Sequence, residues 1–454
     1  MLRSTALVAL VMVATLSPSC GGDETETVVP GDENDPPVWS DAPETASLGQ
    51  GKGMLLPVTV EDDAADVVTV TVAAVPEGLE VEVVVDDEGA TQLALHTGYA
   101  LSGPVSFDVV LDDTKDTTTV SVALQILPVR WLANPSWSEA RGPEAREHGS
   151  MIVDSDAGQA FVFGGSGYAP YLEPFNDAWR YDIASGSWSE ATVSGDVPPP
   201  AGSRRVAHVP GTKTAYLWGG YGGVDGADSF SDLYRVTVDG SELVFDLLEQ
   251  TNEPPARALH GFAYDPGSER FALFGGAGSG LFDDTWTMTL EGDTAIWTEV
   301  DTDDAPKNRY GFFTGVDTER GRMIVFSGQI TQTTFADDTW ALDMRAEPPV
   351  WELVSEGGAA GEPPGRRNGC AVFDPAGERL FVFGGTSDGM TTEPGLFAFD
   401  ARPGKQAWTQ LDLDGQPDVR SSGFGFYDSA GDRTLLGFGN TATAVYRDWG
   451  IIGY

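Results

Sequence analysis

Six arginines recur at similar intervals between residues 146 and 420, each at the start of a similar segment. They are Arg146, Arg205 (or its neighbour Arg204), Arg257, Arg309, Arg366 (or Arg367) and Arg420. If a repeating fold brings these positions around one pore, their guanidinium groups form a cationic well that could hold an acidic sugar by paired hydrogen bonds. The alternative is structural: the arginines cap backbone carbonyls and pair with loop aspartates. These aspartates are Asp177, Asp232, Asp284 and Asp338.

Three of the four histidines follow closely on these arginines: His148, His208 and His260. If the strands that carry them converge on one axis, three imidazoles from neighbouring segments could hold a metal ion. The alternative is that each histidine is a structural residue. Arginines and histidines together are the candidate ligand-binding residues at the mouth of a channel.

The elements that must position these residues are short strands in a repeat of roughly 52 to 57 residues. The stretch FVFGG at 161–165 returns as YLWGG at 216–220, ALFGG at 272–276 and FVFGG at 381–385. Each unit has a first strand after the arginine, a tight turn such as DPGSER at 265–270, the strand that ends in Gly-Gly, and two further strands, the last beginning with an aromatic residue. Asp, Pro and Gly are the residues that such turns require. Four strands per unit predict an all-β fold, a six-bladed β-propeller over residues 129–454.

The last unit ends at Tyr454 after its third strand. The segment at 137–140, WSEA, has the form of a fourth strand but precedes the first unit. We expect it to pair with the last unit and close the ring, because an open ring would leave an exposed edge strand.

The four hydrophobic residues before Gly-Gly, the spaced Trp or Tyr and the R-x-x-H-G start together resemble kelch repeats of the galactose-oxidase type. That resemblance implies a propeller that serves as a binding platform for a protein or glycan partner. Galactose oxidase itself needs a cysteine crosslinked to a tyrosine beside two histidines. Here Cys370, in NGCAVFD, is the one cysteine beyond the N-terminal region, and we interpret it as a small buried hydrophobe.

A second reading is a carbohydrate-modifying enzyme, similar to the kelch-type sialic acid mutarotases, with an arginine-lined channel. It would need a channel carboxylate for proton transfer. Glu147 beside His148 is the nearest candidate, and the alternation of side chains along a strand argues against it. No P-loop, nucleophile elbow or C-x-x-C motif occurs. We therefore assign no catalytic residue and favour a binding protein.

The N-terminal region predicts export. Residues 1–20 combine Arg3, an apolar run and SPSC, and resemble a bacterial lipoprotein signal in which Cys20 becomes lipidated. Residues 21–35 are an acidic, flexible tether. Residues 36–128 contain alternating runs that predict a small β-sandwich, similar to cadherin-like and immunoglobulin-like modules. Its acidic loop could bind Ca²⁺, the sole cofactor we consider, or simply be solvated. The carboxylates are Glu61, Asp62, Asp63 and Asp66.

The charge balance excludes one class of partner. The formal net charge of −44 repels phosphate backbones, so we expect no nucleic acid partner. The sequence as a whole predicts an exported, monomeric binding protein of the bacterial cell envelope. A lipid anchor would hold it at the outer membrane or cell surface, and without the anchor it would be secreted.

Overall fold

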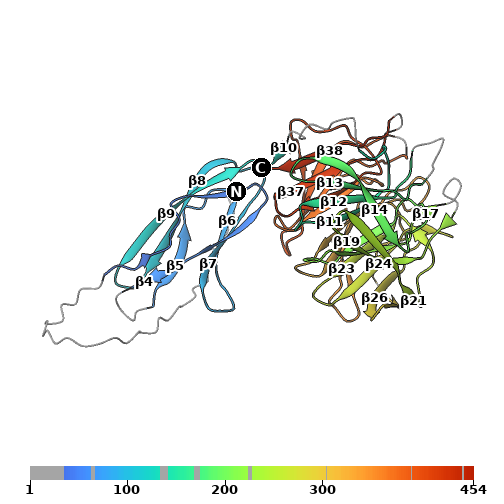
Figure 1. Cartoon of the computed structure of the whole chain (residues 1–454). Helices are drawn as coiled ribbons and strands as arrows, with labels where there is room; N and C mark the ends of the chain where they lie inside the picture. The colour runs from blue at the N-terminus through green and yellow to red at the C-terminus, as the bar shows by residue number, and fades with distance from the viewer. Residues whose placement is uncertain are drawn as a thin grey trace, which may run out of the picture. The chain divides into compact units, whose positions relative to one another are not determined.

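The computed structural model describes residues 35–62, 67–132, 142–167, 174–222, 228–302, 304–389, 391–441 and 444–454. The chain divides into two compact units, residues 1–129 with Tyr454 and residues 130–453. Every regular element in the described ranges is a β-strand (Figure 1), which confirms the all-β prediction.

The first unit has two sheets over one hydrophobic core. The sheets have the strand orders β2-β9-β8-β5 and β3-β7-β6, and β1 pairs with β4. The bounds are β1 Val38–Trp39, β2 Ala46–Gly49, β3 Gly53–Pro57, β4 Val60–Glu61, β5 Thr69–Ala73, β6 Leu79–Val85, β7 Thr91–Thr97, β8 Gly103–Asp112 and β9 Thr117–Leu127. Phe107, Val109 and Leu111 alternate with less buried residues along β8 and enter the core with Leu93 and Leu95 of β7. This two-residue period follows from the strand pleat.

The second unit contains, within its described residues, six antiparallel sets of four strands, here called sets 1 to 6 (Figure 1). Set 1 is β11 Ser150–Asp154, β12 Gln159–Phe163, β13 Ala178–Asp182 and β14 Ser187–Gly195; set 2 is β15 Arg205–His208, β16 Thr214–Trp218, β19 Leu233–Asp239 and β20 Glu242–Leu247. Set 3 is β23 Gly261–Asp265, β24 Arg270–Phe274, β26 Thr285–Glu291 and β27 Thr294–Val300; set 4 is β28 Phe313–Asp317, β29 Arg322–Phe326, β30 Thr339–Asp343 and β31 Val350–Ser355. Set 5 is β32 Cys370–Asp374, β33 Arg379–Phe383, β34 Leu396–Asp400 and β35 Ala407–Leu411; set 6 is β36 Phe424–Asp428, β37 Arg433–Gly437, β38 Trp449–Gly453 and β10 Arg130–Leu132.

Set 6 takes its fourth strand from the start of the unit. β10 pairs antiparallel with β38, with Trp131 opposite Ile452. The segment 137–140, which we expected in this role, lies outside the described residues. The outer edge of set 6 is therefore covered by β10, which comes a few residues earlier in the chain than the predicted closing strand.

Two parallel pairings join the outer strands of sets 1, 2 and 3. β14 pairs with β20 from Thr192 opposite Glu242 to Gly195 opposite Phe245. The short strand β21, Glu249–Thr251, pairs in parallel with β27. Sets 1 and 2 thereby form one eight-stranded sheet.

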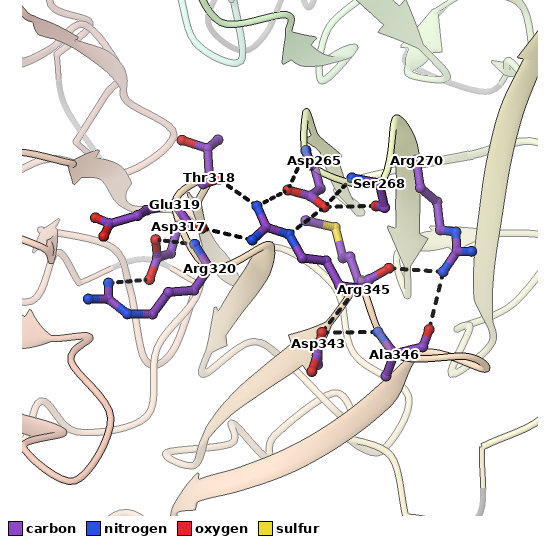
Figure 2. Close-up of polar contacts among 12 residues, drawn as sticks. Asp265, Ser268, Arg270, Asp317, Thr318, Glu319, Arg320, Asp343, Arg345 and Ala346 are labelled. Carbon is purple, nitrogen blue, oxygen red and sulfur yellow. Dashed lines mark hydrogen bonds and ion pairs between the residues drawn. The ribbon is translucent and has the colours of Figure 1, made fainter. Parts of the chain in front are cut away.

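Side chains also join successive sets at the turn that follows each first strand. Figure 2 shows the contacts between sets 3 and 4, where Arg270 donates from Nη1 to the carbonyls of Met344 (2.9 Å) and Ala346 (3.2 Å). In the next turn, Arg320 pairs with Asp317 of its own set at 3.1 Å and with Glu378 of set 5. The turns that the sequence predicts thus also connect neighbouring sets.

Candidate functional site

The arginine at the start of five sets belongs to the framework of the unit. Arg146 donates from Nη1 to the Gly164 carbonyl (2.9 Å) and forms a two-pronged pair with Asp177, at 2.7 and 2.9 Å. The others bind in the same manner: Arg257 to Gly275 and Asp284, Arg309 to Ser327 and Asp338, Arg366 to the carbonyls of Gly384 and Pro394, and Arg420 to Asp448. These five arginines are 0 to 2% exposed.

The five buried arginines therefore do not form the cationic well that we considered at a channel mouth. Apart from Arg420 Nη2, which has no hydrogen-bond partner among the described residues, their N–H groups point mainly to carbonyl and carboxylate oxygens of their own set, and the five side chains are buried away from a ligand. This is the structural alternative, and a buried guanidinium requires such partners because desolvation of an unpaired charge is unfavourable.

Set 2 reaches the same arrangement by a different residue. Ala201 occupies the place of the arginine: its carbonyl accepts from Gly165 N, just as the Arg257 carbonyl accepts from Gly220 N. Arg204, three residues later, donates to the Gly219 carbonyl at 2.9 Å and lies over the ring of Phe230. Arg204 is thus the framework arginine of set 2, and Arg205 is released from that role.

Two rings of backbone hydrogen bonds run from set to set around an axis. In the first, the N–H after the second strand donates to a carbonyl of the next set, and Gly439 N donates to the Arg146 carbonyl (3.0 Å), which joins set 6 to set 1. The second ring consists of residues with positive φ, here called the inner ring, and backbone hydrogen bonds join each neighbouring pair of described residues in it except Ser203 and Leu259. It comprises His148, Ser203, Leu259, Gly311, Asn368 and Ser422. For example, His148 N donates to the Ser422 carbonyl and Ser203 N to the His148 carbonyl.

On one side of the inner ring, each set presents two residues at equivalent places, here called the rim pairs. Bridges place the residue after the framework position beside the residue after Gly-Gly. The rim pairs are Glu147 with Ser166, Gly202 with Tyr221, Ala258 with Ala277, Tyr310 with Gln329, Arg367 with Thr386, and Ser421 with Asn440. Set 3 alone contributes two alanines, and the other five sets contribute polar or aromatic side chains.

Hydrogen bonds connect the rim pairs of neighbouring sets. Arg367 donates from Nη1 to Tyr310 Oη at 2.6 Å and lies over the Tyr310 ring. Tyr310 Oη donates to Gln329 Oε1 at 2.5 Å. Ser166 Oγ and Tyr221 Oη lie 3.1 Å apart, across sets 1 and 2. The rim is therefore an ordered polar surface with partly exposed aromatic rings.

Arg205 and Arg367 differ from Arg146, Arg257, Arg309 and Arg420, because neither forms an ion pair with a carboxylate of the described residues. Arg205 donates from Nε to the His260 carbonyl at 3.0 Å. Burial lowers the pKa of Arg205 to about 10. Burial also lowers the pKa of His148 to about 3, and the charges of Arg205 and Arg367 act in the same direction. His148 is therefore a neutral imidazole between two cations.

Glu147 is a buried carboxylic acid at the rim. It is 7% exposed and accepts a hydrogen bond from Asn440 Nδ2. Burial raises the pKa of Glu147 to about 7, against the effect of hydrogen bonds from Asn440 and Ser422. Burial, followed by the charge of Glu147, also raises the pKa of Tyr221. We had set Glu147 aside on strand alternation, but His148 takes positive φ before β11 begins, so alternation does not apply there.

On the other side of the inner ring, the first strands surround a cavity of about 490 Å³. Val153, Arg205, Thr314, Phe373 and Phe424 are among the residues that line it. His208 also lines it, accepts a hydrogen bond from Val153 N at Nε2 (3.2 Å), and has a pKa lowered to about 4 by burial.

His260 is a packing residue. It is 1% exposed and its ring meets the Trp218 ring edge-on, 5.0 Å between centroids. Burial, then Arg205 and Arg257, lower its pKa well below the usual value. Within the described ranges, no group of three or more His, Cys, Asp or Glu residues is arranged to hold a metal ion. His148, His208 and His260 therefore do not form the metal site that we considered.

The remaining candidate residues are only partly described. Glu61 ends β4 and Asp62 follows it, whereas Asp63 and Asp66 lie outside the described residues, as does Cys20. Cys370 is buried in β32, and burial raises the pKa of its thiol to about 12. The part of the chain that the structure describes contains no helix long and apolar enough to cross a membrane.

Sequence reasoning missed most of the rim. Arg367 stands beside Arg366 as the second of two arginines, and Tyr221 follows the Gly-Gly pair directly. The repeat itself offered a signal for the rim pairs. One member of each pair follows the framework position and the other follows Gly-Gly, and both positions recur in every set.

Comparison with known proteins gives a consistent result. A model of the KLHDC2/KLHL20/DRC7 Kelch-repeats domain matches residues 206–440, just over half of the chain. Adagio-like protein 1 of Oryza sativa subsp. japonica is 26% identical over 270 residues, 56% of this chain and 41% of that protein. Leucine-zipper-like transcriptional regulator 1 of Pongo abelii is 28% identical over 329 residues, 66% of this chain and 35% of that protein. The chain thus spans less than half of the length of these curated relatives.

The solved structure of YjhT is similar in fold. It matches with a TM-score of 0.51 at 14% identity, over 68% of this chain and 95% of its own. At that identity the likeness concerns the fold alone.

Proposed function

Because this chain belongs to the KLHDC2/KLHL20/DRC7 Kelch-repeats domain family, we propose that sets 1 to 6 are the blades of a closed six-bladed propeller that binds a protein partner at the rim. The backbone bond from Gly439 N to the Arg146 carbonyl supports closure. The observation that carries the binding role is the rim itself. Polar side chains stand at equivalent places in five blades, and the framework arginines are committed elsewhere.

The rim has the chemistry of a binding surface. Tyr310 and Arg367 are half-buried, ordered by their mutual hydrogen bond, and not satisfied by a carboxylate of the described residues. Tyr and Arg are residue types that dominate binding energy at protein interfaces, because they bury large areas with little loss of conformational freedom. A glycan is the other ligand class we propose for this surface, since aromatic rings and amide groups also suit sugars.

A display selection tests the binding role. A random peptide library would be selected against residues 21–454, and enriched peptides measured against the wild type and Tyr310→Ala/Arg367→Ala. Arg322→Ala is the control, because Arg322 of β29 pairs with the exposed Glu352 of the outer strand β31. We expect the rim variant to lose at least tenfold in affinity, about 1.4 kcal/mol, and the control to lose none. Peptides that bind both variants equally would place the site elsewhere.

A carbohydrate-modifying enzyme is the second candidate, and Glu147 favours it. A carboxyl with a pKa of about 7 can give and take a proton near neutral pH, and Tyr221 lies close by. Anomer interconversion of acidic sugars, followed by NMR, would test this activity. Activity lost in Glu147→Gln would support the enzyme, and no activity in the wild type would leave the binding role.

We further propose the export route and the first unit's role. A Cys20-linked lipid would anchor the chain at the bacterial outer membrane or surface, and the two-sheet unit would be a cadherin-like or immunoglobulin-like spacer. The signal-like pattern of residues 1–20 and the alternating strands of residues 36–128 support this proposal.

A further inference from the structure

The cavity on the other side of the inner ring has properties separate from those of the rim. Its volume of about 490 Å³ falls in the range of about 300 to 1,000 Å³ that small-molecule sites occupy. At one end it meets the inner ring, where His148, Asn368 and Ser422 border it. At the other end it reaches the turns after the first strands, including Asp154 and Thr212. The cavity therefore runs the length of the first strands.

Part of the wall of the cavity is apolar, beside a comparable polar surface. Val153, Thr314, Ala371, Phe373 and Phe424 line it and come from β11, β28, β32 and β36. On β28, Thr314 is less buried than its neighbours Phe313 and Gly315, as expected for a side chain that faces an open space. Such a wall favours a ligand with an apolar body, since burying apolar surface is favourable by roughly 25 cal/mol per Å².

Two arginines, Arg205 and Arg204, line the end of the cavity near the inner ring. Arg205 begins β15, lines the cavity, and forms no ion pair with a described carboxylate. Arg204 also lines it, but its guanidinium lies over the rings of Phe230 and Tyr234; its Nη1 donates to the Gly219 carbonyl, and Nε and Nη2 have no hydrogen-bond partner among the described residues. His148 and His208 are neutral at pH 7 because burial lowers both pKa values. The local charge is therefore positive, in a chain whose net charge is −44.

The acidic residues of the cavity lie at the opposite end. Asp154 ends β11, whereas Ser150 at its start donates from Oγ to the Arg204 carbonyl, next to Arg205. Asp154 lies four residues after Ser150 along β11, which corresponds to about 13 Å along the strand. A negative group at Arg205 would thus be well separated from Asp154.

We propose that this cavity binds a small monocarboxylate with an apolar, preferably aromatic, body. The carboxylate pairs with the Arg205 guanidinium, and the body lies against Phe373 and Phe424. The aspartates of the chain provide an anionic partner for Arg146, Arg257, Arg309 and Arg420. The bound carboxylate provides Arg205 with a partner of the same kind. The site is independent of partner binding at the rim, since Arg367 and Tyr310 do not line the cavity.

Calorimetry on residues 21–454 would test the site with phenylacetate, its uncharged analogue phenylacetamide, and acetate. We expect phenylacetate to bind at least tenfold more tightly than either, because the amide lacks the charge and acetate lacks the ring. Arg205→Gln should abolish the preference for phenylacetate over phenylacetamide. Thr314→Phe should weaken binding of both by narrowing the cavity.

Arg367→Gln is the matched control, as it removes an arginine on the other side of the inner ring. It should bind phenylacetate within about twofold of the wild type, while losing affinity for rim ligands. The proposal is overturned if wild-type protein shows no binding of phenylacetate at millimolar concentration, or binds phenylacetamide equally well. Undiminished phenylacetate binding by correctly folded Arg205→Gln or Thr314→Phe would overturn it as well.

Discussion

Arg345 binds both carboxylate oxygens of Asp265, with Nε 3.0 Å from Oδ2 and Nη2 2.8 Å from Oδ1 (Figure 2). Asp265 is the last residue of β23, and Arg345 follows β30, so this pair joins two neighbouring blades. Arg345 also donates to the carbonyls of Thr318 and Glu319. Burial alone would raise the pKa of Asp265, but hydrogen bonds from Arg345 and Ser268 outweigh it and lower the pKa to about 2.

Asp265 should therefore stabilise the propeller in a pH-dependent manner. Its pKa is depressed in the folded state, so the stabilisation is complete above about pH 4 and is lost as the pH falls towards 2. A shift from 3.8 to about 2 corresponds to about 2 kcal/mol. We expect Asp265→Asn to lose this amount at pH 7 and about half of it at pH 3.

Urea unfolding of the full chain, followed by tryptophan fluorescence, measures this loss. Asp293→Asn is the control, because the Arg235–Asp293 pair is exposed and should contribute less than about 1 kcal/mol. An Asp265 effect that does not change between pH 7 and pH 3 would contradict the assignment.

Glu147 should give the opposite pH dependence in a different window. Its pKa is raised from 4.5 to about 7, so the folded state holds a proton that the unfolded state releases, and stability falls as the pH rises from about 4.5 to 7. Glu147→Gln should be more stable than the wild type by less than about 1 kcal/mol at pH 5 and by about 3 kcal/mol at pH 8. The same urea titrations at pH 5, 6.5 and 8 measure this, and equal slopes for both proteins would refute it.

The repeat made the fold predictable to a useful degree. The Gly-Gly pairs mark the ends of the second strands because positive φ and close packing admit no side chain: a Cβ on Gly165 would lie 2.8 Å from the Glu147 carbonyl oxygen. The aspartates of the turns between first and second strands, such as Asp265, could also be recognised from the sequence. The candidate site was harder to predict. His148 and Ser203 of the inner ring have positive φ but are not glycines, so the sequence does not mark a turn at these positions.

Other features depend on spatial contacts that a period does not encode. In set 2, Ala201 stands where the other sets have an arginine, and Arg204 donates to the Gly219 carbonyl instead. This exchange can be recognised only from the contact between Arg204 and Gly219 in the structure. The parallel pairing of β14 with β20 is likewise a contact between outer strands of different repeats. Sequence spacing therefore identified the arginines but not which of them face the axis.

Lipidation of Cys20 is testable in a bacterial host. If residues 1–20 act as a lipoprotein signal, the wild-type chain should incorporate radiolabelled palmitate and partition with membranes, because the acyl chains insert into the bilayer. Cys20→Ser should lose the label and leave the membrane fraction, while Cys370→Ser should behave as the wild type. Label retained in Cys20→Ser would exclude this anchor.

The final prediction separates the framework arginines from the axial one. Arg257 is buried and binds Asp284 with both terminal nitrogens and the Gly275 carbonyl with one of them. Arg257→Gln should therefore lose about 3 to 5 kcal/mol of unfolding free energy, since it leaves Asp284 without its cation in a mostly buried place. Arg205→Gln removes a charge that has no carboxylate partner in the described residues, so it should change stability by less than about 1 kcal/mol or increase it. Urea unfolding of both variants without added ligand decides the matter, and a larger loss for Arg205→Gln than for Arg257→Gln would reverse the two assignments.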